Sequence, residues 1–422
     1  MNKLKRYISL LLISVSTVLL LNSCSSNTST SLNSTQSEEN SQAETSSLPT
    51  NTSTSTSLNS TQGKENSQAE TSLPTDQSLY FLSNYQSHAF SKEHNIIVFL
   101  IDRLDYDCIT DVLEKDPDFF NKLDGFTSYT NAISEFARTI PAANHILTGY
   151  EENVYIDKSA DFLDRSWLGY GSNILDEMNN AGYEINIYSD IEAMFGTPQK
   201  FADNVSNMNW DTNDNMAEKE YKIDEIEFAK DIENMSAQDE KKHLKFYHFL
   251  GAHTPYILNS DGSKSEKKTS RVEQTMGCFS ILYKTFDKMK ELGIYKDSEI
   301  IIVADHGEAV SDSEPVQKAT AIGLFHKPSG SSDTPLEYNN APVSHKNIPS
   351  TILRAMGVKS YMDYGTPLDT VDENSDLIRY FYKSIVLDNH EEKVVKYAIT
   401  GDAKVFSNWK IIEEYDAEYY FY

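Results

Sequence analysis

The amino-acid sequence predicts an α/β protein: a three-layer α/β/α sandwich with a mostly parallel central sheet and a small antiparallel hairpin at the C-terminal end. Two observations lead to this prediction. From about residue 79 onward, short runs of consecutive apolar residues alternate with longer amphipathic stretches. Near the C-terminus the pattern changes to alternating residues on both sides of a Gly-Asp pair. Continuous apolar runs are typical of strands buried on both faces, whereas alternation is typical of a hairpin.

Five apolar runs are expected to be strands: NIIVFLI (95–101), EINIYS (184–189), LKFYHFL (244–250), EIIIVA (299–304) and TAIGLF (320–325). Three amphipathic stretches are expected to be helices: 172–181 before Gly182, 216–233, and 269–292 before Gly293. A glycine just past the last helical residue is a common helix end. The hairpin is expected within residues 391–422, where VVKYAITGDAKVFSNWKIIEEYD (394–416) carries the alternating pattern. Helices on both faces of a parallel sheet make the expected sandwich.

Residues 1–24 have the layout of a secretory signal, with basic residues followed by an apolar run that ends at Leu-Asn-Ser-Cys. The run is too short for a comfortable membrane span. The ending resembles a bacterial lipobox, which implies that Cys24 carries a lipid and becomes the mature N-terminus. The alternative is an ordinary cleaved signal in which the cysteine is incidental. The first interpretation predicts an extracytoplasmic protein that is lipid-anchored to the bacterial cell membrane.

Residues 25–78 are almost entirely Ser, Thr, Asn, Gln and Glu, too polar to offset the entropy of ordering. The segment SLNSTQSEENSQAETSSLPT returns as SLNSTQGKENSQAETSLPT, a tandem repeat without hydrophobic positions. Such copies cannot form a packed repeat array. We expect a disordered tether that holds the folded domain away from the membrane.

The formal net charge of −27 argues against binding of nucleic acid by electrostatic attraction. Only three cysteines occur. If Cys24 is lipidated, Cys108 and Cys278 are left as one possible pair, and whether they pair stays open. This count predicts neither a disulfide framework nor a cysteine metal cluster. The oligomeric state also stays open.

Acidic and imidazole side chains follow two of the expected strands. Asp102 comes directly after the run at 95–101, and Asp305-His306 follows the run at 299–304. Ligands of open α/β sheets gather beyond the carboxyl ends of the strands, so these side chains are expected to converge there. Mixed oxygen and nitrogen ligands suit Zn²⁺ or Mn²⁺. The sequence therefore predicts a site for one or two divalent ions.

Thr139 lies in FARTIPAANHILTG (136–149), where Pro141 suits the first turn of a helix and Gly149 its end. We expect Thr139 at the N-cap or just before it. A capping role alone would explain a threonine there. The same geometry favours a phosphate group, because free N–H groups and the positive end of the helix dipole meet at a helix start. A threonine hydroxyl needs a metal nearby to become a nucleophile.

Three histidines are further candidates for a second metal or for the substrate. His248 and His253 lie in FYHFLGAHTPY (246–256), where a strand runs into a loop. His345 lies just ahead of a helix expected to start near Asn347. Histidines also satisfy buried hydrogen bonds, so a purely structural role is the alternative for each.

The order of these elements resembles the alkaline phosphatase and sulfatase superfamily, in particular its sulfatase-like hydrolases, lipoteichoic acid synthases and phosphoethanolamine transferases. The resemblance covers about residues 94–357 and the terminal hairpin, and its most specific pieces are IIIVADHGE and HFLGAHTPY. It implies an alkaline-phosphatase-like fold, with a catalytic domain over 79–390 and the hairpin packed on it. It also implies the following metal ligands: Asp102, Thr139, Asp305 and His306.

The same resemblance makes Thr139 the nucleophile and His253 a catalytic group that contacts the substrate or a second zinc. His345 matches a position that binds metal or substrate in some branches. Two departures bear on the reaction. Sulfatases carry Cys or Ser in a C/S-x-P-x-R context, whereas this chain has Thr139 and, four residues later, Ala143. The membrane-bound transferases carry several transmembrane helices, which a lipid tether would replace here.

These observations predict a metal-dependent phosphoester hydrolase or phosphotransferase. Its expected substrate is a phosphodiester or phosphomonoester of the cell envelope, cleaved through a covalent intermediate on Thr139. The residues alone do not distinguish a hydrolase from a transferase, because both share the first half-reaction. Two alternatives stay open: a sulfuric ester hydrolase, and a catalytically degenerate lipoprotein that binds at the surface.

Overall fold

A computed structural model describes residues 86–149, 171–189, 204–206, 224–238, 241–308, 321–386 and 392–416. The signal at 1–24, the tether at 25–78 and the first part of the helix expected at 216–233 lie outside these residues. None of the helices in the described part of the chain is both long and apolar enough to cross a lipid bilayer.

An eight-stranded sheet forms the centre of the molecule, in the order β10-β3-β9-β8-β2-β7-β4-β5. Its strands are β2 (Asn95–Ile101), β3 (Thr127–Tyr129), β4 (Tyr183–Tyr188), β5 (Asn204–Ser206), β7 (Lys242–Phe249), β8 (Ser298–Val303), β9 (Leu324–Lys327) and β10 (Glu337–Asn339). All neighbouring strands pair in parallel except β9, which is antiparallel to both β8 and β3. A separate pair, β1 (Ala89–Ser91) and β6 (Ser236–Gln238), is also parallel. The prediction of a mostly parallel sheet is therefore confirmed.

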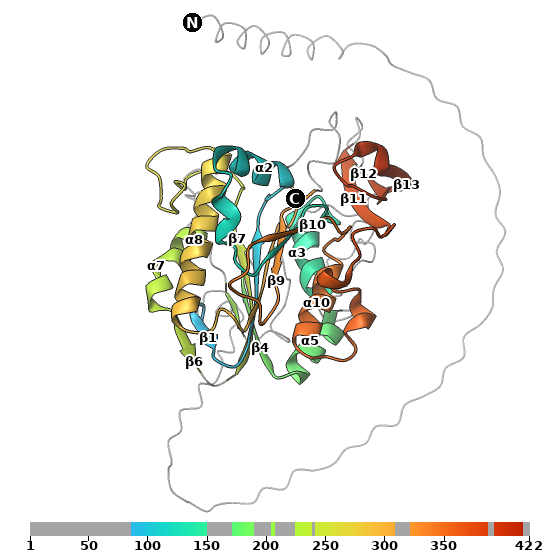
Figure 1. Cartoon of the computed structure of the whole chain (residues 1–422). Helices are drawn as coiled ribbons and strands as arrows, with labels where there is room; N and C mark the ends of the chain where they lie inside the picture. Colours follow the sequence, from blue (N-terminus) through green and yellow to red (C-terminus); the bar gives the residue numbers. More distant parts are fainter. Residues whose placement is uncertain are drawn as a thin grey trace, which may run out of the picture. The chain divides into compact units, whose positions relative to one another are not determined.

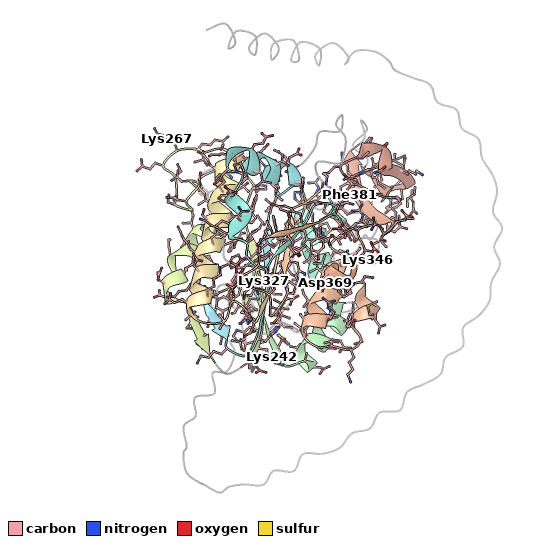
Figure 2. All side chains as sticks on the ribbon, in the orientation of Figure 1. Lys242, Lys267, Lys327, Lys346, Asp369 and Phe381 are labelled. Carbon is pink, nitrogen blue, oxygen red and sulfur yellow. The ribbon has the colours of Figure 1, made fainter. Side chains whose placement is uncertain are left out.

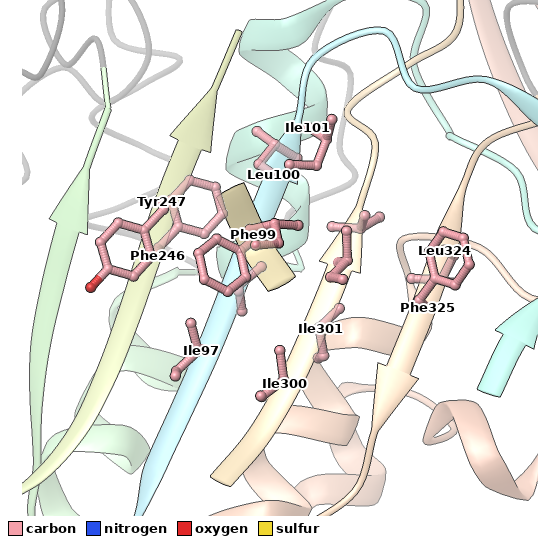
Figure 3. Packing of buried hydrophobic residues seen from close by; sticks show 14 of the residues in the cluster. Ile97, Phe99, Leu100, Ile101, Phe246, Tyr247, Ile300, Ile301, Leu324 and Phe325 are labelled. Atoms are coloured by element: carbon pink, nitrogen blue, oxygen red, sulfur yellow. The ribbon is translucent and has the colours of Figure 1, made fainter. Parts of the chain in front are cut away.

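The central strands are apolar because both of their faces are covered. Every residue of β2 is buried. Phe99 stacks on Tyr247 of the neighbouring β7, with ring centroids 5.3 Å apart, and Figure 3 shows these rings beside the isoleucines of β8. Burying an aromatic or branched side chain stabilises the fold by about 1.5–3 kcal/mol. The four strands β8, β2, β7 and β4 thus hold in place the side chains at their carboxyl ends.

Two groups of helices cover the two faces of the sheet (Figure 1). On one face lie α2 (Tyr106–Lys115), α7 (Asp224–Lys230) and α8 (Arg271–Glu291), and on the other lie α3 (Thr139–Thr148), α5 (Gly171–Asn180) and α10 (Asn347–Ala355). Short 3₁₀ turns complete the fold: Phe119–Lys122, Ile232–Asn234, Tyr361–Tyr364, Leu368–Thr370 and Phe406–Asn408. Helix α8 begins at a capping box in which Ser270 and Glu273 bond each other's backbone N–H. The predicted three-layer sandwich is confirmed.

A small antiparallel sheet follows the main body, in the order β11 (Arg379–Val386), β12 (Glu392–Ile399) and β13 (Trp409–Asp416). Strands β12 and β13 are the predicted hairpin, and β11 is an additional strand. The sheet packs through Phe381 and Trp409 onto Ile133 of the main body, and Figure 2 labels Phe381 at this junction. Because β11 precedes residue 391, the antiparallel appendage begins earlier in the chain than the sequence suggested.

Several boundaries differ from the sequence prediction. Helix α3 starts at Thr139 with Arg138 as its N-cap, so Thr139 is the first helical residue rather than the cap. Only the last two residues of the run expected at 320–325 belong to β9, which spans Leu324–Lys327. In the part of the 216–233 stretch that is described, the helix is short and ends at Lys230. Cys108 and Cys278 are both buried and free, so they do not pair.

Candidate active site

Three adjacent strands bring their polar carboxyl-terminal residues together. Asp102 follows β2, Asp305 lies just beyond β8, and His248 is the last residue but one of β7. Because β8, β2 and β7 are parallel neighbours, these side chains meet at one edge of the sheet. One ligand atom from each lies within 4.8 Å of the other two. The structure therefore brings together the two carboxylates that the sequence singled out. It places beside them His248, which the sequence offered for a second metal or for the substrate.

One polar atom of each side chain in this cluster lacks a hydrogen-bond partner among the described residues. Asp102 Oδ1, Asp305 Oδ2 and His248 Nε2 are buried, and none has a hydrogen-bond partner in the described part of the chain. A buried polar atom without a partner costs about 1–3 kcal/mol, so three of them at one point are a poor arrangement for the protein alone. A divalent cation would satisfy all three. Two carboxylates and imidazoles suit Zn²⁺ or Mn²⁺, and this donor set fits the predicted metal.

His248 is oriented by a second polar residue, Ser189, which follows β4. Its Nδ1 lies 3.0 Å from the hydroxyl oxygen of Ser189. Burial lowers the pKa of His248 to about 4, so the ring is neutral at neutral pH. A neutral ring that donates its Nδ1 proton to Ser189 presents a lone pair at Nε2, which lies 4.0 Å from Asp102 Oδ2. This is the orientation that metal-binding histidines have when an outer residue fixes the tautomer.

His306 and Thr139 complete the cluster. Nδ1 of His306 lies 2.5 Å from the carbonyl oxygen of Gly307, which leaves Nε2 facing the site. That nitrogen lies 3.4 Å from Asp305 Oδ2 and 4.0 Å from Asp102 Oδ1. The hydroxyl of Thr139 lies 3.3 Å from the same nitrogen. The structure thus gathers all four predicted ligands around one point, and their roles as ligands stay predictions.

Helix α3 explains how Thr139 reaches this point. Its hydroxyl stands at the first helical residue, where the N–H groups of the first turn have no partner within the helix. Gly149, with φ of 68°, ends the helix in the left-handed conformation that glycine adopts without strain. The positive end of the helix dipole therefore points toward the same site as the hydroxyl.

The pKa values of the two carboxylates are shifted in opposite directions. Burial and the neighbouring charge of Asp305 raise the pKa of Asp102 well above its usual range. Burial acts in the same direction on Asp305, but His306, His248 and the hydroxyl of Thr139 bring the pKa of Asp305 below its usual value. Two buried acids this close are not easily ionised together. A bound cation would remove that conflict.

The loop after β7 is built against Asp102. The N–H of Asp102 bonds the Phe249 carbonyl at 3.0 Å, and the Ala252 N–H bonds the Asp102 carbonyl at 2.9 Å. Gly251 has φ of 58°, and a Cβ at this position would lie 3.0 Å from the Asp102 nitrogen. Glycine is needed there because both the conformation and the close approach exclude a side chain.

Glu225 of α7 holds this loop in place, and no sequence pattern indicated that role. Its carboxylate accepts the Gly251 N–H at 2.5 Å and the Leu250 N–H at 3.2 Å. The side chain is fully buried, which raises its pKa to about 7. Glu225 lies in an ordinary charged stretch, DEIEFAK, and the groups of the loop that it bonds are backbone N–H groups, which leave no pattern in the sequence.

The two remaining predicted histidines differ in position. His253 is half-buried in the loop beyond Gly251, and its Nδ1 contacts the Thr254 carbonyl. His345 is fully buried and its Nε2 lies 2.8 Å from the Ala304 carbonyl, directly before Asp305. His345 therefore supports the end of β8. Among the described residues no second group of three or more metal-binding side chains forms, so a second ion stays a prediction.

With the geometry established, comparison with known proteins identifies the family. The sulfatase family model matches residues 94–358, more than half of the 422-residue chain. The chain belongs to the sulfatase family. No curated protein matches it.

Solved structures are similar to this sulfatase-family chain in fold. A protein of the alkaline phosphatase superfamily from Vibrio parahaemolyticus superposes with a TM-score of 0.50 at 16% identity, covering 76% of this chain and 82% of the other. The lipoteichoic acid synthase LtaP from Listeria monocytogenes gives a TM-score of 0.46 at 13% identity, covering 76% and 86%. The C-terminal periplasmic domain of EptC from Escherichia coli gives 0.43 at 13% identity, covering 68% and 88%. The fold is alkaline-phosphatase-like, as predicted.

Family and geometry together define the chemistry in broad terms. The sulfatase-family domain supports a hydrolase or transferase. A cluster of two aspartates and a histidine forms a candidate divalent-metal site within it. The hydroxyl of Thr139 lies at the edge of that cluster, at the start of a helix.

Proposed function

We propose that this protein is a metal-dependent phosphoester hydrolase or phosphotransferase that uses Thr139 as its nucleophile. The observation that carries this proposal is the position of the Thr139 hydroxyl, which lies 3.3 Å from His306 Nε2 and lowers the pKa of Asp305. Three distant segments of the chain, which carry Asp102, Asp305-His306 and Thr139, meet at this cluster. A threonine that only starts a helix does not need such neighbours. Asp102, Asp305, His306 and Thr139 would hold the cation, with His248 as a further ligand.

Phosphate is a better substrate for this nucleophile than sulfate. The residue in the nucleophile position is threonine, and the position four residues later is Ala143 rather than arginine. Sulfatases mature a Cys or Ser in that position to formylglycine, which threonine does not supply. A threonine oxygen can form a phosphate ester directly.

The proposed reaction has two half-reactions. Oγ of Thr139 attacks phosphorus and its proton passes to the Asp305 carboxylate, with which that hydroxyl interacts. The bond from phosphorus to the leaving oxygen breaks, and His253 supplies a proton to that oxygen. Water or an acceptor hydroxyl then attacks phosphorus and gives its proton to His253. The bond from phosphorus to Thr139 Oγ breaks, and Oγ recovers its proton from Asp305. When bound, the divalent cation supplies the positive charge that lowers the pKa of the hydroxyl and offsets the negative charge of the phosphoryl oxygens.

The proposed substrate lies outside the cell. The lipobox-like ending at Cys24 and the polar tether at 25–78 support a protein anchored to the bacterial membrane by lipid, acting on a phosphorylated component of the envelope. Intact-mass measurement of the membrane-bound protein should show that residues 1–23 are absent and that Cys24 carries a lipid. A mature protein that begins at another residue, or that carries no lipid, would contradict the anchor.

The decisive experiment replaces Thr139 in zinc- or manganese-loaded protein. Thr139→Ala should lower turnover of a chromogenic phosphodiester by on the order of 10³-fold or more, because it removes the hydroxyl that forms the ester. Thr139→Ser should keep measurable activity, since it retains the hydroxyl. Thr110→Ala, an exposed threonine on α2, serves as the matched control. Full activity in Thr139→Ala would overturn the proposal.

Two further measurements distinguish the alternatives. Adding glycerol as an acceptor separates the two enzyme classes, because a transferase forms glycerol phosphate at the expense of free phosphate. A chromogenic sulfate ester tests sulfuric ester hydrolysis. Metal-free protein that turns over none of these esters, even after incubation with zinc or manganese, would favour a surface-binding role on a degenerate fold.

A further inference from the structure

Arg103, the residue directly after Asp102, adopts a backbone conformation that side chains rarely take. Its φ is 57°, in the left-handed region. For a residue other than glycine this conformation costs roughly 1–2 kcal/mol and is often found at functional sites. Its N–H donates to Asp305 Oδ1 at 3.0 Å. The unusual backbone therefore turns the chain at the metal cluster and determines where the Arg103 side chain lies.

The guanidinium of Arg103 has no acceptor in the described part of the chain. Other buried or half-buried arginines there bond acceptors through their terminal nitrogens. Arg271 bonds Asp105 at 2.8 Å. Arg354 pairs with an aspartate, and Arg379 bonds backbone carbonyl oxygens. Arg103 makes no such hydrogen bond or ion pair, although its Nε is buried.

An unpaired half-buried arginine is unusual in this chain because acidic groups are abundant. The sequence holds 64 acidic residues against 37 basic ones. Withdrawing a charge from water costs free energy unless another charge or hydrogen bond replaces the water. A guanidinium that is held near a metal cluster and left without a carboxylate is available for an anion from outside the protein.

Arg103 is close to both parts of the site. It directly follows Asp102, and its N–H bonds Asp305 Oδ1 at 3.0 Å. Burial lowers the pKa of His253, and Arg103 acts in the same direction. Arg103 is thus close to the metal cluster and also to the loop that carries His253. An anion bound by both the cation and His253 would lie within reach of Arg103.

We propose that Arg103 binds the phosphate group of the substrate, with its N–H groups donating to non-bridging phosphate oxygens. A planar guanidinium can bind two such oxygens at once. This inference rests on the proposed function, since it adds a binding residue to the same site. Arg103 thereby favours an ester whose phosphate retains two negatively charged or partly charged oxygens.

The test measures binding of inorganic phosphate to zinc-loaded full-length protein by calorimetry and as a competitive inhibitor. Arg103→Asn and Arg103→Gly both remove the guanidinium and both accept a positive φ, so neither variant strains the backbone. Each should weaken phosphate binding about 10- to 100-fold. Arg103→Lys keeps the positive charge but not the planar guanidinium. Its phosphate affinity should lie between that of these two variants and that of the wild type. Arg354→Gln, on α10, is the control and should bind phosphate as the wild type does.

Zinc affinity and melting temperature separate binding from structure. We expect zinc affinity to change little in Arg103→Gly, since Arg103 contributes only its backbone N–H to the cluster. The melting temperature should stay equal or rise, because glycine adopts the positive φ without the steric cost. Phosphate affinity within twofold of the wild type in both the Asn and the Gly variants would overturn the inference. Failure of the proposed function has a different result: wild-type protein that binds phosphate through Arg103 but turns over no phosphoester.

Discussion

The two ends of the central sheet bury charged groups in opposite ways. Toward the amino ends of the strands, His326 Nε2 lies 2.5 Å from Glu299 Oε1, and the other oxygen of Glu299 accepts the Ser329 N–H at 2.7 Å. At the carboxyl ends, three side chains face one another with polar atoms that have no partner among the described residues: Asp102, Asp305 and His248.

This difference distinguishes, within one sheet, buried polar groups that pair with each other from buried polar groups that are left for a ligand. Both ends are almost inaccessible to water, so burial alone does not identify the site. Paired groups stabilise the fold, whereas groups that converge without partners cost stability unless a ligand binds them. Three substitutions test the comparison, in order of decreasing expected effect.

Asp102→Asn should act on the unpaired end. Removal of a residue that only hydrogen-bonds a metal ligand weakens metal binding roughly 10- to 100-fold. Removal of the Asp102 carboxylate itself should weaken zinc binding by more than that, and turnover should fall with it. In metal-free protein the same change should leave stability equal or raise it by about 1 kcal/mol, because it removes repulsion between two buried acids. Thermal melts with zinc and with chelator measure both effects.

Asp111→Asn, at an exposed position on α2, is the matched control for this experiment. If metal-free Asp102→Asn were less stable than wild type while zinc still raised its melting temperature as much, the carboxylate would be structural. The two ends of the sheet would then not differ.

Glu299→Ala should act on the paired end. It leaves His326 and the Ser329 N–H without their acceptor, and breaking a buried pair costs about 3–5 kcal/mol of unfolding free energy. Zinc affinity and turnover per folded molecule should not change, because the pair lies away from the carboxyl ends of the strands. Denaturant unfolding gives the stability, and zinc titration gives the affinity. A loss of zinc affinity would show that the ends are coupled.

Glu225→Gln should change the pH dependence of stability. The folded-state pKa of Glu225 is about 7, raised from 4.5. The folded protein therefore holds this proton more tightly, and the stabilisation is complete below about pH 4.5 and lost as the pH rises through 7. Between pH 5 and pH 7 the free energy of unfolding of the wild type should fall by about 2 kcal/mol because of Glu225, and that of Glu225→Gln should not show this fall.

The comparison is made on metal-free protein by denaturant unfolding at both pH values. Other titrating groups contribute equally to the two proteins, so the difference between their pH slopes isolates Glu225. Identical slopes would show that Glu225 is ionised in the folded state throughout this range.

The sequence alone predicted the residues of the site that come directly after a strand. Asp102 and Asp305 each come directly after a continuous apolar run, and such runs predict buried parallel strands. Thr139 was found because a proline and a glycine mark the ends of its helix. These signals are local, so one sequence contains them.

Other parts depend on contacts that no local pattern records. His248 lies inside a buried strand, where a histidine is usually structural, and only the neighbouring strands show what its Nε2 faces. Glu225 bonds backbone groups of a loop about 25 residues away. Strand β11 was assigned to the main domain, because its pairing with β12 is a contact between two segments that no local pattern records. Arg103 stands out only through its φ and its lack of a partner among the described residues.

The C-terminal sheet is joined to the segment that leads into Thr139. The Tyr382 N–H bonds the Glu135 carbonyl at 2.8 Å, and the ring of Tyr382 stacks on Phe136 at 5.5 Å. Ribosomes make this sheet after all the strands of the central one. During synthesis, Thr139, the proposed nucleophile, therefore acquires its final support only once the chain has emerged beyond Tyr382. A fragment shortened at residue 378 should fold its main sheet yet hold Thr139 loosely.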